Sequence, residues 1–126
     1  MNRVLLLWML LALAGCVTPT PDVRATLVAS FMDSGHAYAA AGQYTAAAAA
    51  FGEALYAAPT DAAPALALVD LYLAWGDPAA GLSALETAKA RGASGDVVWP
   101  RRLALLLAAG EWEQVIGAAQ EILEES

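Results

Sequence analysis

The sequence predicts an all-α fold in which three helical hairpins stack into a short right-handed solenoid. Gly42, Gly76 and Gly110 recur at a constant interval, and the same apolar pattern surrounds each of them. An interval of ~34 residues is typical of a helix–turn–helix repeat. Each glycine lies between two apolar-periodic stretches, where a residue that tolerates a positive φ can end one helix before the next begins. A compact six-helix bundle is the alternative, and the constant interval argues against it.

Two helices are expected in each repeat. The three repeats span residues 28–61, 62–95 and 96–126. The six expected helices cover residues 28–41, 44–57, 62–75, 78–91, 96–109 and 112–125. Asp77 followed by Pro78 is typical of an N-cap and the first helical position. Asp61 and Asp96 precede helix starts in the same way, each with a proline in the first turn of the helix.

The final helix is expected to carry its apolar side chains on one stripe. That stripe consists of Trp112, Val115, Ile116, Ala119, Ile122 and Leu123. Polar residues, most of them glutamates, occupy the other side. A helix of this kind can cover one end of a stack and face water with its polar side. We therefore expect the last helix to cap the array.

The first repeat resembles the tetratricopeptide repeat. The aromatic, glycine, alanine and proline signature of that family is carried by Phe31, Gly35, Tyr38, Gly42, Tyr44, Ala47, Phe51, Ala54 and Pro59. The second and third repeats are degenerate, since Val69 and Leu103 replace the first glycine and Ala93 replaces the closing proline. The resemblance covers nearly all of residues 28–126. It implies stacked hairpins whose inner helices line a concave groove.

The same resemblance assigns inner-helix residues to that groove. They are Met32, His36 and Ala39, then Leu66, Asp70 and Leu73, then Arg101, Ala104 and Leu107. His36 and Asp70 occupy equivalent places in neighbouring repeats, which makes a pairing between their side chains one of two alternatives. A polar contact at the rim without a function is an equal alternative for both residues.

The composition of the predicted groove indicates the kind of ligand. The family's clamp for the carboxylate of a peptide C-terminus uses several Lys, Asn and Arg residues, of which only Arg101 has a counterpart here. Binding of chaperone tails is therefore not expected. A groove rich in Leu, Met and Ala suits an apolar peptide or an amphipathic helix.

The N-terminal residues resemble a bacterial lipoprotein signal peptide. Asn2 and Arg3 give a short positive start, and residues 4–14 form an uncharged apolar stretch. A membrane-spanning helix needs ~20 apolar residues, whereas the core of a signal peptide has ~7–15, so the stretch fits only the latter. The lipidation box of that class is matched by Leu13, Ala14, Gly15 and Cys16.

This resemblance implies that residues 1–15 are removed and that Cys16 carries a diacylglycerol and becomes the first residue. Two acyl chains give stable anchoring, whereas one chain binds only marginally. Two alternatives remain open, namely a free buried thiol at Cys16 and an uncleaved signal anchor. By resemblance to the sorting pattern of Gram-negative lipoproteins, Val17 after the cysteine favours the outer membrane, facing the periplasm. The plasma membrane is the other possible location.

Residues 16–27 are expected to form the lipidated cysteine and a tether, because residues 17–27 contain two prolines and no apolar periodicity. About 10 residues reach at most ~35 Å when fully stretched. The folded part of the chain should therefore stay close to the bilayer, and its partners should be membrane-proximal.

Charge and residue content exclude several classes of function. Arg3 is the only charge within residues 1–15, so 13 acidic and 5 basic residues remain after their removal and the net charge becomes −8. Such a chain repels phosphate backbones, so no nucleic-acid binding is expected. His36 is the only histidine and Cys16 the only cysteine, so no metal site is expected. Neither a G-x-S-x-G turn nor a phosphate-binding G-x-x-x-x-G-K-[ST] loop occurs, and we expect no enzymatic activity and no cofactor.

The function expected from these observations is that of a protein–protein interaction scaffold in cell-envelope assembly, such as pilus, secretion or wall machinery. The chain resembles the repeat-containing lipoproteins that help to assemble outer-membrane secretins. Its partner would be a protein or peptide of the cell envelope, and its membrane contact would be the lipid on Cys16. The alternative is a non-catalytic carrier or sensor that binds a lipid or a small apolar ligand in the groove.

Overall fold

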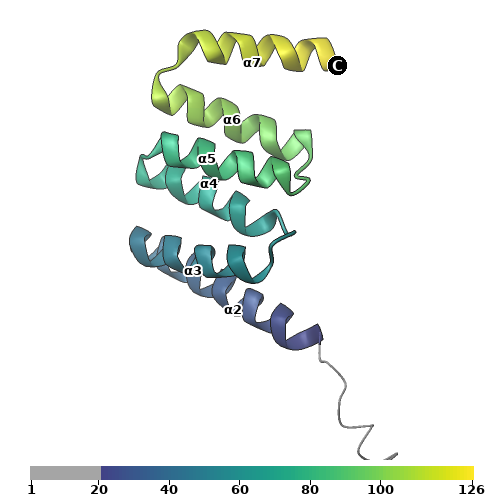
Figure 1. Ribbon diagram of the computed structural model, residues 1–126. Coiled ribbons are helices and arrows are strands. Elements are labelled where there is room, and N and C mark those ends of the chain that lie inside the picture. The colour runs from purple at the N-terminus through teal and green to yellow at the C-terminus, as the bar shows by residue number, and fades with distance from the viewer. Residues whose placement is uncertain (1–20) are drawn as a thin grey trace, which may run out of the picture.

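The computed structural model describes residues 21–126, which form six α-helices and no β-strand within that range (Figure 1). The helices are α2 (Pro21–Ala40), α3 (Tyr44–Ala57), α4 (Ala63–Trp75), α5 (Pro78–Ala90), α6 (Gly95–Ala109) and α7 (Trp112–Glu125). The predicted all-α class is confirmed. The predicted signal peptide, Cys16 and residues 17–20 lie outside the described residues. No helix within residues 21–126 has the length and apolar character needed to cross a bilayer.

The helices stack in the order in which they occur along the chain. Figure 1 shows α2 at one end of the stack and α7 at the other, with the C-terminus beyond the last helix. Each helix packs against the next one, and α4 also contacts α6. The connections between helices are short, so successive helices run in opposite directions. The result is an elongated arrangement whose two end helices are α2 and α7.

The turn glycines adopt the backbone conformation that their spacing predicts. Gly42, Gly76 and Gly110 have φ angles of 72°, 84° and 73°. These positive values are readily accessible to glycine and rare for other residues. Asp77 caps α5 as predicted, because its carboxylate accepts a hydrogen bond of 3.1 Å from the N–H of Ala80.

The start of α2 differs from the prediction. The helix begins at Pro21 and not at residue 28, so residues 21–27, which the sequence predicts as part of the tether, are helical. Proline is common at the first helical position because its missing N–H is not needed there. No further proline within α2 interrupts the helix. The first turns of α2 extend past the end of α3 (Figure 1).

The start of α6 also differs from the prediction. Ser94 is the N-cap and the helix begins at Gly95, so Asp96 lies in the first turn and does not precede the helix. A carboxylate in the first turn is stabilised by the partial positive charge of the helix N-terminus. Pro100 consequently lies inside the helix and not in its first turn.

The core lies between consecutive hairpins. One cluster joins α3 to α4 and consists of Ala47, Phe51, Leu68 and Leu71. A second cluster joins α4, α5 and α6 and consists of Val69, Leu85, Val98 and Leu105. Gly35 allows α2 to approach α3 closely, because a Cβ at this position would overlap the ring of Phe51. Gly81 has the same role on α5, where a Cβ would overlap the side chain of Leu105.

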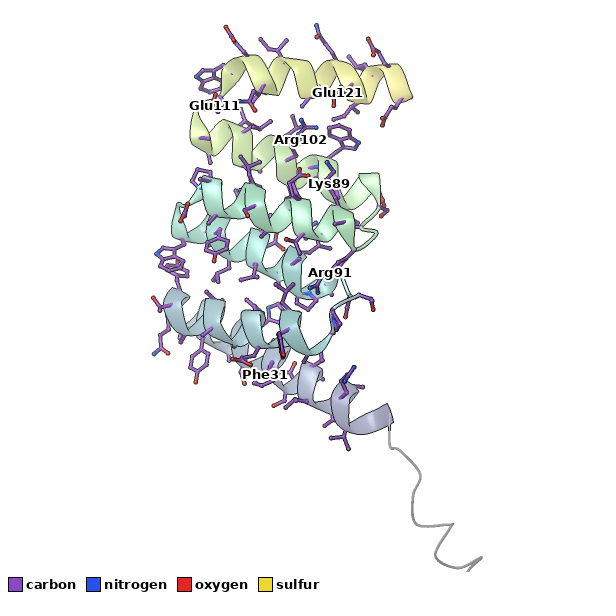
Figure 2. The ribbon with its side chains drawn as sticks, viewed as in Figure 1. Phe31, Lys89, Arg91, Arg102, Glu111 and Glu121 are labelled. Carbon is purple, nitrogen blue, oxygen red and sulfur yellow. The ribbon has the colours of Figure 1, made fainter. Side chains whose placement is uncertain are left out.

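Arg91, labelled in Figure 2, connects the end of α5 to the loop between α3 and α4 through hydrogen bonds. Its Nη1 donates hydrogen bonds to the carbonyl oxygens of Leu55, Ala58 and Asp61 at 3.1, 2.8 and 3.0 Å. These carbonyls belong to the last turn of α3 and to the loop after it. The second hairpin is thus tied to the first by polar contacts as well as by apolar packing.

The last helix does not cap the stack in the way the sequence predicts. Its only buried residue is Ala118, and Val115 and Ile122 are half-buried. The remaining members of the apolar stripe, Trp112, Ile116, Ala119 and Leu123, are exposed. Within residues 21–126 α7 packs mainly against α6, so only the side of α7 that carries Val115, Ala118 and Ile122 is covered.

Candidate binding surface

The predicted groove residues lie on α2, α4 and α6, and three of them meet at one cavity. His36, Ala39 and Asp70 line a cavity of about 250 Å³ between the first and second hairpins. Its other lining residues are Tyr44, Phe51, Ala67, Leu71 and Ala74. Residues of two hairpins therefore lie close together at this cavity.

The predicted pairing of His36 with Asp70 is wrong. Asp70 is bound by Arg101, whose Nε donates to Oδ1 at 2.9 Å and whose Nη2 donates to Oδ2 at 3.0 Å. The planar guanidinium matches a carboxylate with two parallel hydrogen bonds, which is a stronger arrangement than a single bond. The ring of His36 packs edge-on against Phe51, with centroids 5.0 Å apart and planes at 71°.

The pair of Asp70 and Arg101 joins α4 to α6 at the surface of the stack. The side chain of Arg101 is 28% exposed and that of Asp70 is 55% exposed. The remaining nitrogen of Arg101, Nη1, donates to the carbonyl of Val97 at 3.0 Å. All three guanidinium nitrogens are thus engaged within the chain, and the two charges compensate each other. Because Arg101 is bound to Asp70 and Val97, it is not favoured as the residue that binds a ligand carboxylate.

The apolar residues predicted for the groove contribute mainly to packing. Met32 is half-buried against the core cluster of α3 and α4. Leu66 and Leu73 are half-buried against the cluster of α4, α5 and α6. Leu107 is exposed. Of the four apolar residues, Leu107 is therefore accessible to a ligand. Met32, Leu66 and Leu73 are accessible only in part.

An aromatic row that the sequence pattern did not assign to binding lies beside the cavity. Trp75 stacks on Tyr44, with ring centroids 5.8 Å apart, and on Tyr72, with centroids 6.0 Å apart. Tyr44 lines the cavity of His36 and also an open recess bordered by Gly42 and Trp75. Two features of the sequence could have indicated this row. Tyr72 occupies the position of Tyr38 one repeat later, and Trp75 directly precedes the turn glycine Gly76.

The candidate binding surface thus consists of the cavity and the aromatic row, beside which the ion pair of Asp70 and Arg101 lies. Trp75 is 43% exposed, so the row offers an aromatic face to solvent. Within residues 21–126 no three His, Cys, Asp or Glu side chains are arranged to hold a metal ion. An aromatic and small-residue surface with a single imidazole at its edge is suited to holding an apolar segment of another molecule.

Comparison with known proteins gives no relative, because no family model, no curated protein and no solved structure matches the chain.

Proposed function

We propose that this chain is a lipoprotein with tetratricopeptide-like repeats that acts as a protein–protein interaction scaffold in cell-envelope assembly, such as pilus, secretion or wall machinery. One observation carries the proposal. His36 and Asp70, equivalent residues of two successive repeats, line the same surface cavity together with Tyr44. In the family that the first repeat resembles, these positions lie in the ligand groove.

A short right-handed solenoid is the arrangement that we propose for the hairpins. Three observations support it. The turn glycines recur at a constant interval with similar positive φ angles. Each helix packs against its neighbour along the chain. The contact between α4 and α6 places the first helices of two successive hairpins side by side, as expected where repeats stack on one another.

The partner that fits this surface is an apolar or amphipathic protein segment. The exposed indole of Trp75 and the cavity beside it provide apolar contact, and His36 at the cavity wall provides a hydrogen-bonding group. Asp70 is already matched by Arg101, so a partner does not have to supply a compensating cation. Amphipathic helices and extended apolar segments are the usual ligands of such grooves.

The proposed anchor is a diacylglycerol on Cys16, in the outer membrane with the repeats in the periplasm. Its support is the lipidation box of residues 13–16 and Val17 after the cysteine. The helix begins at Pro21, so only a few residues separate the anchor from the folded part. The scaffold would therefore work within a short distance of the bilayer.

Site-specific photo-crosslinking in cells tests the proposal. A photo-reactive amino acid replaces His36 in the full-length chain, and the control replaces Glu86, which is exposed on α5 and does not line the cavity. We expect a component of an envelope machine to be crosslinked from position 36, to be absent from position 86, and to be lost in the Cys16→Ala variant. Mass spectrometry identifies the captured protein.

Position 36 is a better test than Leu66 or Leu73, because both leucines pack against the core and their substitution also lowers stability. If position 36 captures nothing, or captures the same proteins as position 86, the scaffold proposal is wrong for this surface. A small molecule retained by the purified chain in native mass spectrometry would instead favour the carrier.

A further inference from the structure

The first end of the stack exposes apolar side chains that the proposed partner surface does not use. Val23 is 67% exposed, Leu27 is 47% exposed and Tyr56 is 88% exposed. All three border an open groove of about 910 Å³, and Arg24 borders it as well. Together Val23, Arg24, Leu27 and Tyr56 form the end patch.

The end patch is built from one side of α2 and the last turn of α3. Val23, Leu27 and Phe31 follow one another at intervals of four residues on α2, a spacing that places them on the same face of the helix. Phe31, labelled in Figure 2, is half-buried and borders the same groove. Tyr56 approaches the groove from the end of α3. A contiguous apolar patch of this kind usually marks a contact surface. The extension of α2 back to Pro21, which the sequence did not predict, is what creates the patch.

The length of chain between the end patch and Cys16 limits what can cover it. Cys16 precedes Pro21 by five residues, and each residue spans at most ~3.6 Å, so the start of α2 lies within ~18 Å of the cysteine. Val23 and Leu27 lie in the first two turns of that helix. A lipid on Cys16 therefore brings the end patch to the headgroup layer of the membrane.

We infer that the end patch rests in the interfacial layer of the lipid bilayer, an inference that rests on the proposed lipidation of Cys16. Valine and leucine side chains bury apolar area at the boundary between headgroups and acyl chains. Tyrosine is enriched at this depth. Arg24 extends its guanidinium to lipid phosphates while its methylene groups stay in the apolar region.

The distribution of charge supports this orientation. The last part of the chain carries Glu111, Glu113, Glu121, Glu124 and Glu125, and it lies at the opposite end of the stack from α2 (Figure 1). Contact through α2 keeps this acidic end away from anionic headgroups, beyond the screening length of about 8 Å. Glu53 borders the groove, and Arg24 and Arg91 border it as well. The stack then stands on the membrane and presents the cavity of His36 to the periplasm.

Cysteine labelling of the full-length chain tests the inference. Cys16 is the only cysteine, so once it is lipidated the variants Leu27→Cys and Tyr56→Cys each have a single free thiol. The thiol is labelled with a polarity-sensitive fluorophore, and the lipoprotein is reconstituted into phosphatidylethanolamine–phosphatidylglycerol vesicles with or without a lipid-borne quencher. Ile116→Cys is the matched control, because Ile116 is 61% exposed at the opposite end of the stack.

We expect a blue shift and loss of fluorescence by lipid-borne quenching at positions 27 and 56, and neither at position 116. If the chain floats with vesicles but all three probes behave alike, the inference is overturned and the anchoring stands. If the N-terminal peptide carries no lipid by mass and the chain does not float, the proposed anchoring fails and the inference fails with it. A blue shift that persists without vesicles in the Cys16→Ala background also overturns the inference, because a second copy or another protein segment then covers the patch.

Discussion

Helices α5 and α7 are the second helices of successive hairpins, yet they bury different surfaces. Leu85 and Ala88 on α5 are 1% and 0% exposed. Their equivalents one repeat later on α7 are Ala119, which is exposed, and Ile122, which is half-buried. The two helices occupy the same place in the repeat, so position within the repeat does not account for the difference.

The difference comes from the neighbours that each helix has in the stack. α5 packs against α4 on one side and α6 on the other, whereas within residues 21–126 α7 has α6 as its main neighbour. The core cluster of Leu85 also contains Val98 and Leu105, which belong to the next hairpin. Each hairpin therefore completes the core of the one before it. The burial of a repeat position depends on its place in the stack as much as on its residue type.

Truncating one leucine in each helix should give the largest difference in stability between α5 and α7. Leu85→Ala leaves a cavity in a closed cluster and should lower the free energy of unfolding by about 2–5 kcal/mol. Leu123→Ala makes the same chemical change on α7, where Leu123 is 74% exposed, and should change it by no more than ~0.5 kcal/mol. Urea denaturation monitored by circular dichroism measures both values. Equal losses in the two variants would mean that α7 is covered as closely as α5.

Adding a methyl group to a glycine should have a smaller effect, with opposite signs at the two ends of the stack. Gly35→Ala forces the Phe51 ring to move and should cost about 1–3 kcal/mol. At Gly117 on α7 an added Cβ meets no atom within 4 Å, so Gly117→Ala should gain up to ~1 kcal/mol from helix propensity. Melting temperatures give the comparison directly. A stabilising Gly35→Ala would show that α2 and α3 are not tightly packed at this point.

The regular part of the fold was accessible from the sequence, because it depends on local signals. The predicted ranges 44–57 and 112–125 coincide with α3 and α7, each of which begins shortly after a turn glycine. The start of α2 was not predicted, because Pro21 is compatible both with an irregular segment and with the first helical position. The exposure of the α7 stripe was not predicted either, because periodicity identifies an apolar face without showing whether a neighbour covers it.

The candidate site was predictable only in part. His36 and Asp70, which are one sequence interval apart, line one cavity together with Ala39, whereas Leu73, one interval after Ala39, does not line it. The relative rotation and separation of α4 and α6 determine whether Arg101 can reach Asp70. The sequence does not give that geometry, so it did not predict that Asp70 pairs with Arg101 and not with His36. The stacking of Trp75 on Tyr44 and Tyr72 likewise depends on how two hairpins are aligned.

The smallest effect should come from two ion pairs, one between α4 and α6 and the other between α6 and α7. Asp70 and Arg101 join α4 to α6 through two bonds of 2.9 and 3.0 Å, whereas Arg102 and Glu121 join α6 to α7 through one contact of 3.3 Å (Figure 2). Both pairs are partly exposed, so each gains little beyond what water already provides. Double-mutant cycles to alanine should give a coupling energy of about 1 kcal/mol for the first pair and about 0.3 kcal/mol for the second.

Salt provides the control for this comparison. Raising the ionic strength to about 1 M shortens the screening length to about 3 Å, so both couplings should fall if they are electrostatic. The two-bond geometry of Asp70 and Arg101 should preserve more of its coupling, because aligned hydrogen bonds are less sensitive to salt than charge attraction alone. A larger coupling for Arg102 and Glu121 would reverse the order and show that α7 is held to α6 by its charges rather than by Ala118 and the half-buried residues beside it.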